Sequence, residues 1–545
     1  MIKVGIMCDD KVDKWQAECI TNLMKNENAE IVSTIRPAEY ETEGFLKNIK
    51  DYYKKAGISS TVNKLTWDLY NKYTNEKKCK KEVEVDSLIR TEKIYCEVEK
   101  DGFSEYFKEK DIERLKNKNI DAIVRFAFGI IRGEILSVPK YGVWSFHHDD
   151  NQKYRGGPPC FWEIYHKDPV TGAVLQRLTE TLDGGEILKR GYFKTKYEYD
   201  ENVCQVYNGT IEWPSYIINE IAKKGDDKIV TKDEIQGDIY KSPSVFSIIK
   251  SEANKIERKI KSKCQGKVWW DIGLHIGRPI DLWQKQTIDV KWFGSSQKEH
   301  FLADPFATTI NGEPFVFFEK YSYSKRKAEI CFIEGHDLDG KQIRNAFETS
   351  EHISYPYIFK EEGRTYCIPE MSSTPGLKIY ELKAPDNWSP KGEILPTLNI
   401  VDPTIISHNN TYWLFCTHSG DYSNTNLYVY YSDNLLSGWK SIYNNPVKTD
   451  VRSARPGGTP IIHNRSLYRI SQDCSEGYGS ALKICKINKL SRCHFDETVY
   501  GEITTSEING KWDGIHHLDS YGDKVFLDAK SHVYNKYYMN KLFKF

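Results

Sequence analysis

The sequence predicts a multidomain protein that is α/β in its first half and all-β in its second. Its 545 residues exceed the roughly 100 to 200 residues of a usual domain, so more than one core is expected. Strand-like and helix-like patterns alternate up to about residue 235, and a strand, turn and strand pattern then recurs five times. We therefore expect a parallel-sheet domain over residues 1–235, a helical connector over 236–266 and a five-bladed β-propeller over 267–545.

The first half begins with a buried strand pattern, "IKVGIM" over 2–7, and an amphipathic helix pattern over 13–26. Two further strand patterns, "AEIVSTI" over 29–35 and "DAIVRFAFG" over 121–129, are typical of a parallel α/β sheet. Residues 36–118 are long and highly charged. They predict an insertion of helices or an additional subdomain.

A lysine-rich stretch, "SVFSIIKSEANKIERKIKSKCQG" over 244–266, predicts the helix that connects the two halves. Its run of charges is more typical of a solvated helix face than of a binding site. We therefore assign no ligand to it.

The second half repeats a pattern of one strand, a polar turn and a second strand. Copies begin roughly every 50 residues, which is the length of a four-stranded propeller blade. The five copies are "ADPFATTINGEPFVFFEK" from 303, "SYPYIFKEEGRTYCIPEM" from 354, "VDPTIISHNNTYWLFCTH" from 401, "GGTPIIHNRSLYRISQDC" from 457 and "HHLDSYGDKVFLDAK" from 516. A β-sandwich with accidental self-similarity is the alternative.

Equivalent positions of these copies would meet around a propeller axis and form a ring rich in carboxylates. The ring would include Asp304, Tyr355, Asp402, Thr459 and His517, with Glu319, Glu370, His418 and Asp528 near the ends of the second strands. Such a ring suits a saccharide-binding or hydrolytic centre. Asp-Pro at a strand start is equally typical of a turn in which the Asp side chain bonds its own backbone, so both interpretations stay open.

Residues 267–545 resemble the five-bladed propellers of arabinanase-type glycoside hydrolases. They resemble more closely the propeller-like N-terminal region of plant glucosamine inositolphosphorylceramide transferases. The stretches that carry this are "FLADPFATTINGEPFVFFEK", "IPE" at 368–370 and "WDGIHHLDSYGDKVFLDAK". In the hydrolases one aspartate is the base, another tunes pKa values and a glutamate is the acid. The resemblance implies Asp304, Asp402 and Glu370 for these positions, and we expect all three to bind substrate.

Composition excludes some classes of function. Lys plus Arg and Asp plus Glu each total 77, so the chain has no overall basic field for nucleic acid. The N-terminus carries acidic residues, and no stretch approaches 18 consecutive apolar residues. We expect a cytoplasmic protein without stable membrane insertion.

The 13 cysteines are scattered without a C-x-x-C pair, which predicts buried thiols and no disulfide framework.

A polar cluster follows a short apolar stretch in "YGVWSFHHDDNQKYRGGPPCFWEI" over 141–164. A metal site on His147, His148, Asp149 and Asp150 is one interpretation. Adjacent histidines on a strand point to opposite faces, however, so both cannot easily hold one ion. We therefore predict no metal here.

Residues 121–190 resemble the folate-dependent formyltransferases that act on methionyl-tRNA, glycinamide ribonucleotide and amino sugars. Three motifs carry the resemblance in order: "FGIIRGEIL", "RGGPP" and "TGAVLQRLTETLDGGEIL". The resemblance implies 10-formyltetrahydrofolate as the formyl donor. It also implies that the donor binds to the loop formed by Phe128, Gly129, Ile130 and Ile131.

In that family an Asn and a His, one residue apart, stabilise the oxyanion that forms when an amine attacks, and an Asp orients the His. The resemblance places His147 on the His and Asp183 on the Asp, but Ser145 stands where the family has Asn. Losing such a donor typically costs roughly 2.7 to 4 kcal/mol. Either a neighbour such as His148 or Asn151 compensates, or the domain has another reaction.

Arg155 of the "RGGPP" motif has two interpretations, a phosphate ligand for the acceptor or a residue that holds its loop. We predict His148, Asn151 and Arg155 as substrate-binding residues. The two resemblances imply transfer of a formyl group to an amino sugar or sugar nucleotide in glycan biosynthesis, with the propeller holding carbohydrate. The alternatives are a glycosyltransferase or glycoside hydrolase that uses the propeller acids, and a non-catalytic glycan-binding protein.

Overall fold

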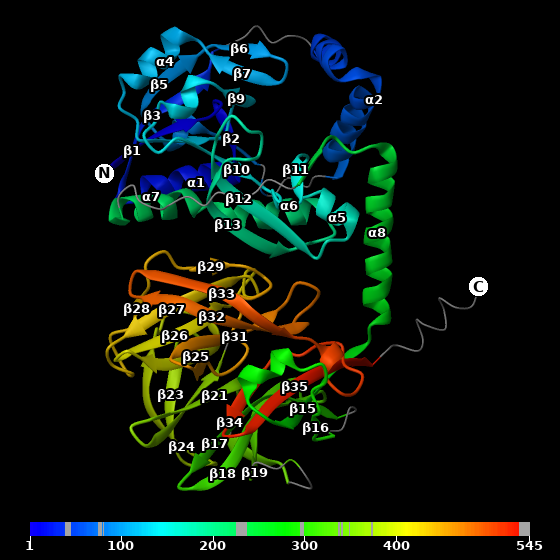
Figure 1. Cartoon of the computed structure of the whole chain (residues 1–545), viewed down its shortest axis with the longest axis vertical. Coiled ribbons are helices and arrows are strands. Elements are labelled where there is room, and N and C mark those ends of the chain that lie inside the picture. Colours follow the sequence, from blue (N-terminus) through cyan, green and yellow to red (C-terminus); the bar gives the residue numbers. More distant parts are fainter. Residues whose placement is uncertain are drawn as a thin grey trace, which may run out of the picture. The chain divides into compact units, whose positions relative to one another are not determined.

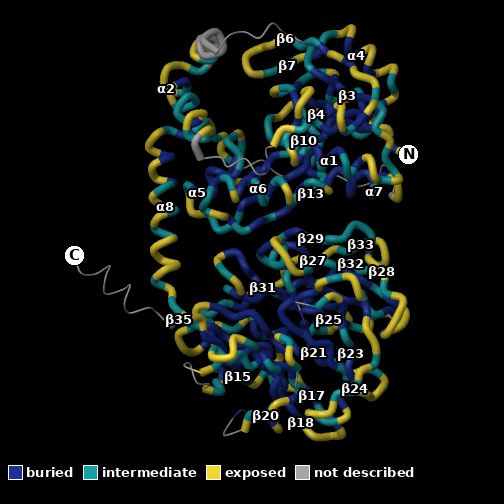
Figure 2. Tube along the Cα trace, turned by 180° about the vertical axis from the view of Figure 1, so that it is seen from behind, coloured by how far each residue is buried: buried dark blue, intermediate teal, exposed yellow. Residues whose placement is uncertain are grey.

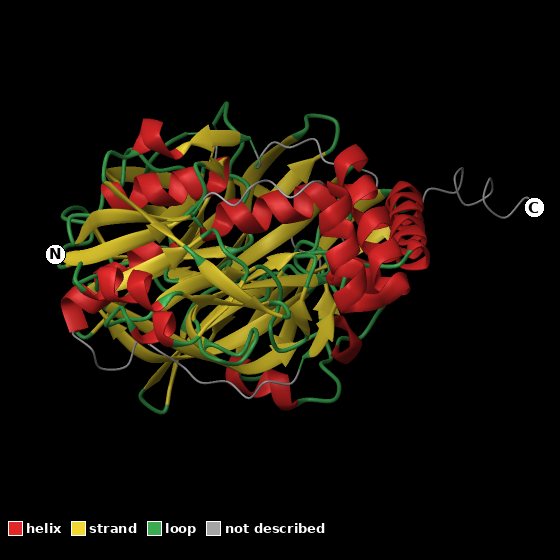
Figure 3. Ribbon diagram, turned by 90° about the horizontal axis from the view of Figure 1, so that it is seen from above, coloured by secondary structure: helices red, strands yellow, loops and turns green. Residues whose placement is uncertain are grey.

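The computed structural model describes residues 1–38, 45–74, 79, 81–224, 237–294, 299–335, 338, 342–347, 349–371 and 374–533. The chain forms two compact units, Met1–Arg258 and Lys259–Phe545, and the boundary falls within helix α8 (Val245–Cys264). Strand is the dominant secondary structure (Figure 3). Among the described residues, no helix combines the length and apolarity needed to cross a bilayer.

The first unit is built on a seven-stranded sheet with the order β13-β12-β10-β8-β1-β3-β5 (Figure 1, blue to green). Its strands are β1 (Ile2–Met7), β3 (Ala29–Pro37), β5 (Glu92–Cys96), β8 (Ala122–Arg125), β10 (Val143–His147), β12 (Val170–Arg177) and β13 (Glu186–Lys194). The strands from β10 to β5 are parallel, whereas β12 and β13 add an antiparallel edge. The predicted parallel-sheet domain is thereby confirmed.

The burial of its central strands on both faces explains why this sheet has continuous apolar strands. Val4, Ile6, Ile123 and Val124 on its central strands are fully buried, as expected for strands covered on both faces.

Besides α8, the helices and 3-10 turn described in this unit are α1 (Lys14–Met24), α2 (Phe45–Thr74), α3 (Val85–Leu88), α4 (Glu109–Lys116), η1 (Glu134–Ser137), α5 (Trp162–His166), α6 (Tyr199–Thr210) and α7 (Trp213–Lys224).

The charged segment 36–118 contains more than helices. Helix α2 is interrupted at Gly57, which has a φ of 80°. Strand β5 joins the main sheet, while β6 (Val98–Asp101) and β7 (Ser104–Phe107) form a small sheet with β9 (Ile130–Arg132). Two short pairs join β2 (Lys11–Asp13) to β4 (Glu82–Glu84) and β11 (Tyr154–Gly156) to β14 (Asp238–Tyr240).

The expectation that the cysteines are thiols needs a correction. Cys79 forms a disulfide with Cys204 of α6, 125 residues further along the chain. Such long-range pairs leave no spacing signal in a sequence, which is why the pattern of cysteines did not predict it.

The second unit is all-β (Figure 1, green to red). Its described residues form five antiparallel sheets. The first four are β17-β18-β19-β20, β21-β22-β23-β24, β25-β26-β27-β28 with β29, and β30-β31-β32-β33; the fifth, β16-β15-β35-β34, joins the two ends of the unit. The buried positions concentrate on strands such as β17, β21, β25 and β31 (Figure 2, dark blue).

The bounds of the strands follow the repeats. They are β15 (Lys267–Ile276), β16 (Lys291–Trp292), β17 (His300–Ile310), β18 (Glu313–Ser322), β19 (Lys327–Glu334), β20 (Arg344–Phe347), β21 (Ser354–Glu361), β22 (Arg364–Glu370), β23 (Leu377–Ala384), β24 (Asn387–Ile394), β25 (Ile400–His408), β26 (Thr411–His418), β27 (Asn426–Ser432), β28 (Lys440–Ser441), β29 (Lys448–Thr449), β30 (Ile461–His463), β31 (Ser466–Asp473), β32 (Ala481–Ser491), β33 (His494–Ile503), β34 (Leu518–Tyr521) and β35 (Lys524–Val533). Two 3-10 turns, η2 (Pro279–Gln284) and η3 (Thr505–Glu507), complete the unit.

A β-bulge recurs at the same place in three of these sheets. Asp304, Tyr355 and Asp402 have φ values of 53°, 40° and 48°, and the strand register shifts at each of them. A left-handed conformation costs a non-glycine residue roughly 1 to 3 kcal/mol, so the surroundings must hold it. The backbone N–H of Asp304 donates to Asp528, and that of Asp402 donates to Glu370. The X-Pro repeats of the sequence therefore mark bulges rather than turns.

Candidate active site

Strand β10 places Ser145 and His147 on the same face of the sheet. The imidazole Nε2 of His147 lies 2.9 Å from the carbonyl oxygen of Tyr154, and its Nδ1 lies 3.6 Å from Oδ1 of Asp183. Both Ser145 and His147 are buried. The structure thus brings together the predicted pair of His147 and Asp183.

A connecting loop holds Asp183 in place. Asp183 has a φ of 50°, and its Oδ2 accepts a hydrogen bond from the backbone N–H of Gly156 at 2.8 Å. Nη2 of Arg155 donates to the carbonyl oxygen of the preceding residue, Leu182, at 2.6 Å. Of the two interpretations of Arg155, this contact favours a residue that holds the loop.

His148 points away from this pair. Its ring stacks on Phe146 at 5.3 Å and lies 4.4 Å from the ring of Tyr207, while Nε2 lies 3.2 Å from the hydroxyl of Thr210. Burial, and secondarily the nearby His147, lowers the pKa of His148 to about 3, so it is neutral at pH 7. Its predicted contact with substrate stays a prediction, and its position in an aromatic cluster counts against it.

Asn151 is also buried, and its Oδ1 accepts a hydrogen bond from Nη2 of Arg190 at 2.9 Å. Its contact with substrate likewise stays a prediction.

The two aspartates that follow the histidines, Asp149 and Asp150, hold the local backbone. Asp149 accepts from the backbone N–H of Cys160 and Asp150 from that of Gln152.

The loop implied to bind folate runs beside β7. Phe128 has a φ of 65° and packs on Phe107 with ring centroids 4.8 Å apart. The backbone N–H of Gly129 donates to Glu105, and its carbonyl oxygen accepts from Nη1 of Arg125. Ile131 is buried and Ile130 is half-buried. Through Arg125, the loop therefore lies next to the strand that carries Ser145.

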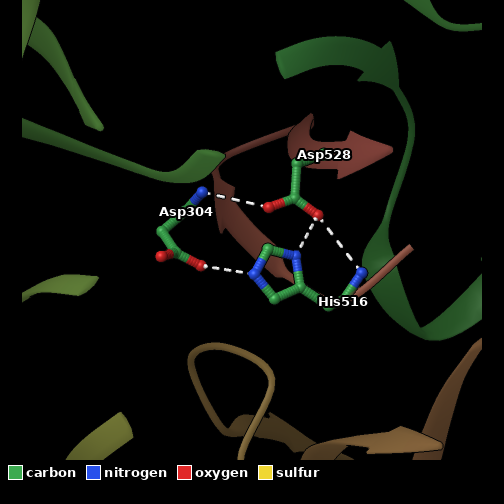
Figure 4. Close-up of side chains that lie close together, drawn as sticks. All are labelled: Asp304, His516 and Asp528. Carbon is green, nitrogen blue, oxygen red and sulfur yellow. Dashed lines mark hydrogen bonds and ion pairs between the residues drawn. The ribbon is translucent and has the colours of Figure 1, made fainter. Parts of the chain in front are cut away.

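The second unit has its own cluster of charges. The ring of His516 lies between two aspartates, with Nδ1 2.8 Å from Asp528 and Nε2 3.3 Å from Asp304 (Figure 4). Burial would lower the pKa of His516, but the two carboxylates raise it. Burial raises the pKa of Asp304 well above its usual range. The sequence reasoning placed His517 in this ring and missed its neighbour, although "HH" contained both.

Three donor atoms of Asp304, His516 and Asp528 lie within 4.8 Å of one another. One imidazole nitrogen and two carboxylate oxygens form a set that a divalent metal accepts. Asp528 accepts hydrogen bonds from the backbone N–H groups of Asp304, His516 and His517, which gives the cluster a structural role without any ion.

The remaining predicted acids are engaged in protein contacts. Oδ2 of Asp402 accepts hydrogen bonds from Nε of Arg455 at 2.6 Å and from Nε2 of Gln472 at 2.9 Å. Asp304, Glu370 and Asp402 are only 5%, 8% and 3% exposed. Their role in substrate binding stays a prediction. His418 lies apart from these acids, with its ring stacked on Tyr428 and its Nε2 2.9 Å from the hydroxyl of Tyr430.

An open pocket of about 460 Å³ lies beside the cluster. It is lined by Gln265, Val268, Trp270, Glu476, Gly477, Tyr478, Ser480, Asp513, Lys530 and His532. The ring of Trp270 lies 4.1 Å from that of His516, and the ring of Tyr478 lies 5.2 Å from it. Two aromatic rings thus separate the buried charges from the pocket. Neither ring was predicted from the sequence, which shows only that 13% of its residues are aromatic.

The two halves match different known proteins. Residues 290–524 match the family model described as glucosamine inositolphosphorylceramide transferase 1, N-terminal. Glucosamine inositolphosphorylceramide transferase 1 of Arabidopsis thaliana is 32% identical over 281 residues, which are 46% of this chain and 37% of that protein. In the N-terminal part, methionyl-tRNA formyltransferase of Prochlorococcus marinus is 40% identical over 91 residues, which are 16% of this chain and 27% of that protein. Both expected resemblances are confirmed, although the chain spans only about a third of these relatives.

Solved structures also resemble the chain. An α-L-arabinofuranosidase from Podospora anserina in complex with cellotriose has 11% identity and a TM-score of 0.32, over 48% of this chain and 97% of that chain. An exo-β-1,3-galactanase from Clostridium thermocellum has 16% identity and a TM-score of 0.32, over 44% of this chain and 61% of that chain.

Proposed function

We propose that the first unit transfers a formyl group from 10-formyltetrahydrofolate to the amine of an amino sugar or sugar nucleotide. The observation that carries this proposal is the pair of His147 and Asp183 at the carboxyl end of a parallel strand, where α/β sheets bind their ligands. The match with formyltransferases in the same part of the chain supports it. When bound, the folate supplies an activated formyl group.

The contacts of His147 assign its proton. A carbonyl oxygen can only accept a hydrogen bond, so Nε2, which faces the carbonyl oxygen of Tyr154, carries the hydrogen of the neutral ring. Nδ1 then presents its lone pair on the side of Asp183. Nδ1 is therefore the atom that takes up the proton of the attacking amine, and the carboxylate of Asp183 stabilises the resulting imidazolium.

Titration calorimetry with 5-formyltetrahydrofolate, a stable analogue of the donor, tests the proposal. We expect micromolar binding to the wild type and weaker binding to the His147→Ala/Asp183→Ala variant. The control is Asp433→Asn, an exposed change in the second unit, which should bind like the wild type. No binding by folded wild-type protein would overturn the proposal. Binding would justify a screen of amino sugars and their nucleotides as acceptors.

We further propose that the five sheets of the second unit are the blades of a propeller and that this unit holds the carbohydrate. The pocket bordered by Trp270 and Tyr478 supports this, because aromatic rings offer apolar faces on which sugars stack. The family match of residues 290–524 agrees with a glycan-related role. The rival, catalysis by the propeller acids, requires that Asp304→Asn or Asp402→Asn abolish turnover while His147→Ala is tolerated.

A further inference from the structure

A half-buried cation lies where the first site lacks a donor. Arg125 ends β8, and the parallel register places it directly opposite Ser145 on β10. Its Nε lies 3.4 Å from the Ser145 hydroxyl oxygen, and its Nη1 donates to the carbonyl oxygen of Gly129 at 2.8 Å. The guanidinium thus lies between Ser145 and the loop implied to bind the donor.

The charge of Arg125 is not neutralised by contact. Among the described residues, no carboxylate lies within 4.0 Å of its guanidinium, and no protein atom accepts a hydrogen bond from Nη2. Asp183 and Glu105 act on it only at longer range. An arginine keeps its proton at every physiological pH, so the site contains a cation with a free donor. Partial burial removes some of the water around this charge, which favours an anionic partner.

Ser145 alone cannot replace the Asn of the family. Its single hydroxyl lies 3.4 Å from the carbonyl oxygen of Phe146, and it reaches less far than a side-chain amide. His148 and Asn151, the expected substitutes, bond to Thr210 and Arg190 instead. Unlike His148 and Asn151, Arg125 has an unused donor beside Ser145.

We propose that Arg125 supplies the hydrogen bonds to the developing oxyanion that the missing Asn would supply, and this inference rests on the proposed formyl transfer. The amine nitrogen forms a bond to the formyl carbon while the carbonyl electron pair moves onto oxygen, where Arg125 stabilises it. That pair then re-forms the carbonyl as the bond from carbon to the folate nitrogen breaks. One proton leaves the amine for Nδ1 of His147, and the leaving nitrogen takes up one proton.

The geometry also explains why arginine suits this position. Hydrogen bonds from a charged donor are roughly twice as strong as those between neutral groups. A planar guanidinium fixed at Nη1 by Gly129 and at Nε by Ser145 loses little further freedom when an anion binds. Ser145 is therefore a positioning residue, and Arg125 is a catalytic residue alongside His147.

A series of variants tests this role by kinetics. Arg125→Ala should lower kcat about 100- to 1000-fold, as expected for the loss of an oxyanion donor, and should change the affinity for 5-formyltetrahydrofolate less than threefold. Adding Ser145→Asn to Arg125→Ala should restore at least tenfold, because it returns the family amide. Arg132→Ala on β9, the next strand along the chain, is the control and should behave like the wild type. A kcat within threefold of wild type for Arg125→Ala would overturn the inference.

Sodium formate tests the same residue without turnover. Titration of ¹³C-formate, followed by NMR, should show millimolar binding to the wild type and to Arg132→Ala, and at least tenfold weaker binding to Arg125→Ala. Absence of formate binding to folded wild-type protein would overturn the inference even if formyl transfer occurs. Formate binding that depends on Arg125, without binding of 5-formyltetrahydrofolate, would instead refute the proposed function and retain the anion site.

Discussion

Arg455 donates a hydrogen bond to Asp402 in a part of the second unit where the two side chains are only 12% and 4% exposed. Removing one partner of a buried pair leaves the other charge uncompensated, which typically costs about 3 to 5 kcal/mol. We expect Arg455→Ala to lower the free energy of unfolding by that amount in urea denaturation. Arg278→Ala, which breaks an exposed pair with Asp281, should cost about 0 to 1 kcal/mol. Equal effects would show that the burial of the pair is irrelevant.

Two buried glutamates should make stability depend on pH. Burial, and secondarily neighbouring acids, raises the pKa values of Glu319 and Glu370 to about 8 from the usual 4.5. A raised acid pKa means that the folded state keeps a proton. This stabilisation is complete below pH 4.5 and is lost as the pH rises through 8. Asp528 acts in the opposite direction because its pKa is lowered, so the test must compare variants with wild type.

We therefore expect Glu319→Gln and Glu370→Gln each to gain up to about 4 kcal/mol of stability relative to the wild type as the pH rises from 5 to 9. The amide mimics the protonated acid and never ionises. Unfolding in urea at several pH values measures the difference. Glu313→Gln, an exposed change at the start of β18, should show no such trend. A constant difference across this range would contradict the assignment of neutral acids.

The pocket beside His516 predicts where sugar binds. Trp270→Ala should weaken the binding of glucosamine and N-acetylglucosamine disaccharides about tenfold, because the ring of Trp270, which is only 5% exposed, forms a wall of the pocket. Trp270→Phe should retain most of the affinity. Tyr521→Ala removes an exposed aromatic ring outside the pocket and serves as the control in the same glycan array. Unchanged binding by folded Trp270→Ala would exclude this pocket.

The disulfide can be detected by counting free thiols in the denatured chain. The denatured chain should show 11 free thiols without reductant and 13 with it. In the chain-entropy model, opening a loop of this length costs roughly 4 to 5 kcal/mol, so Cys79→Ser/Cys204→Ser should unfold at a clearly lower temperature. Cys493→Ser, at an exposed free thiol, should not. Thirteen thiols in both titrations would contradict the pairing.

The fold could be predicted where burial imposes a simple pattern. The central strands β1 and β8 are covered on both faces and read as apolar runs, and the strand pairs of the second half repeat with visible prolines. Strands β6 and β7 could not be predicted, because "VEKD" and "SEYF" have only four residues each and show no clear alternation of buried and exposed positions. The partner of Cys79 was equally hidden, because pairing over 125 residues depends on the fold rather than on spacing.

The residues of the candidate site were likewise predicted only in part. His147 and Asp183 were predicted because each lies in a recognisable motif, and the structure places them 3.6 Å apart. Arg125 was not predicted, because a single arginine within "AIVRFA" gives no sign of its neighbour. Only the register of β8 against β10 brings it to Ser145. The burial of Asp304 and Asp402 was also invisible, since it depends on Arg455, His516 and other residues distant in sequence.

The fifth sheet pairs β15, from the beginning of the second unit, with β35, from its end. The family match spans residues 290–524, so it starts after β15 and includes only the first residue of β35. A fragment expressed with those limits would leave β34 without its partner. The unpaired N–H and C=O groups of β34 would then form an exposed sheet edge, which favours aggregation. The limits of the matched sequence and of the paired strands therefore differ here, and we expect soluble expression of the second unit to need both Lys267 and Val533.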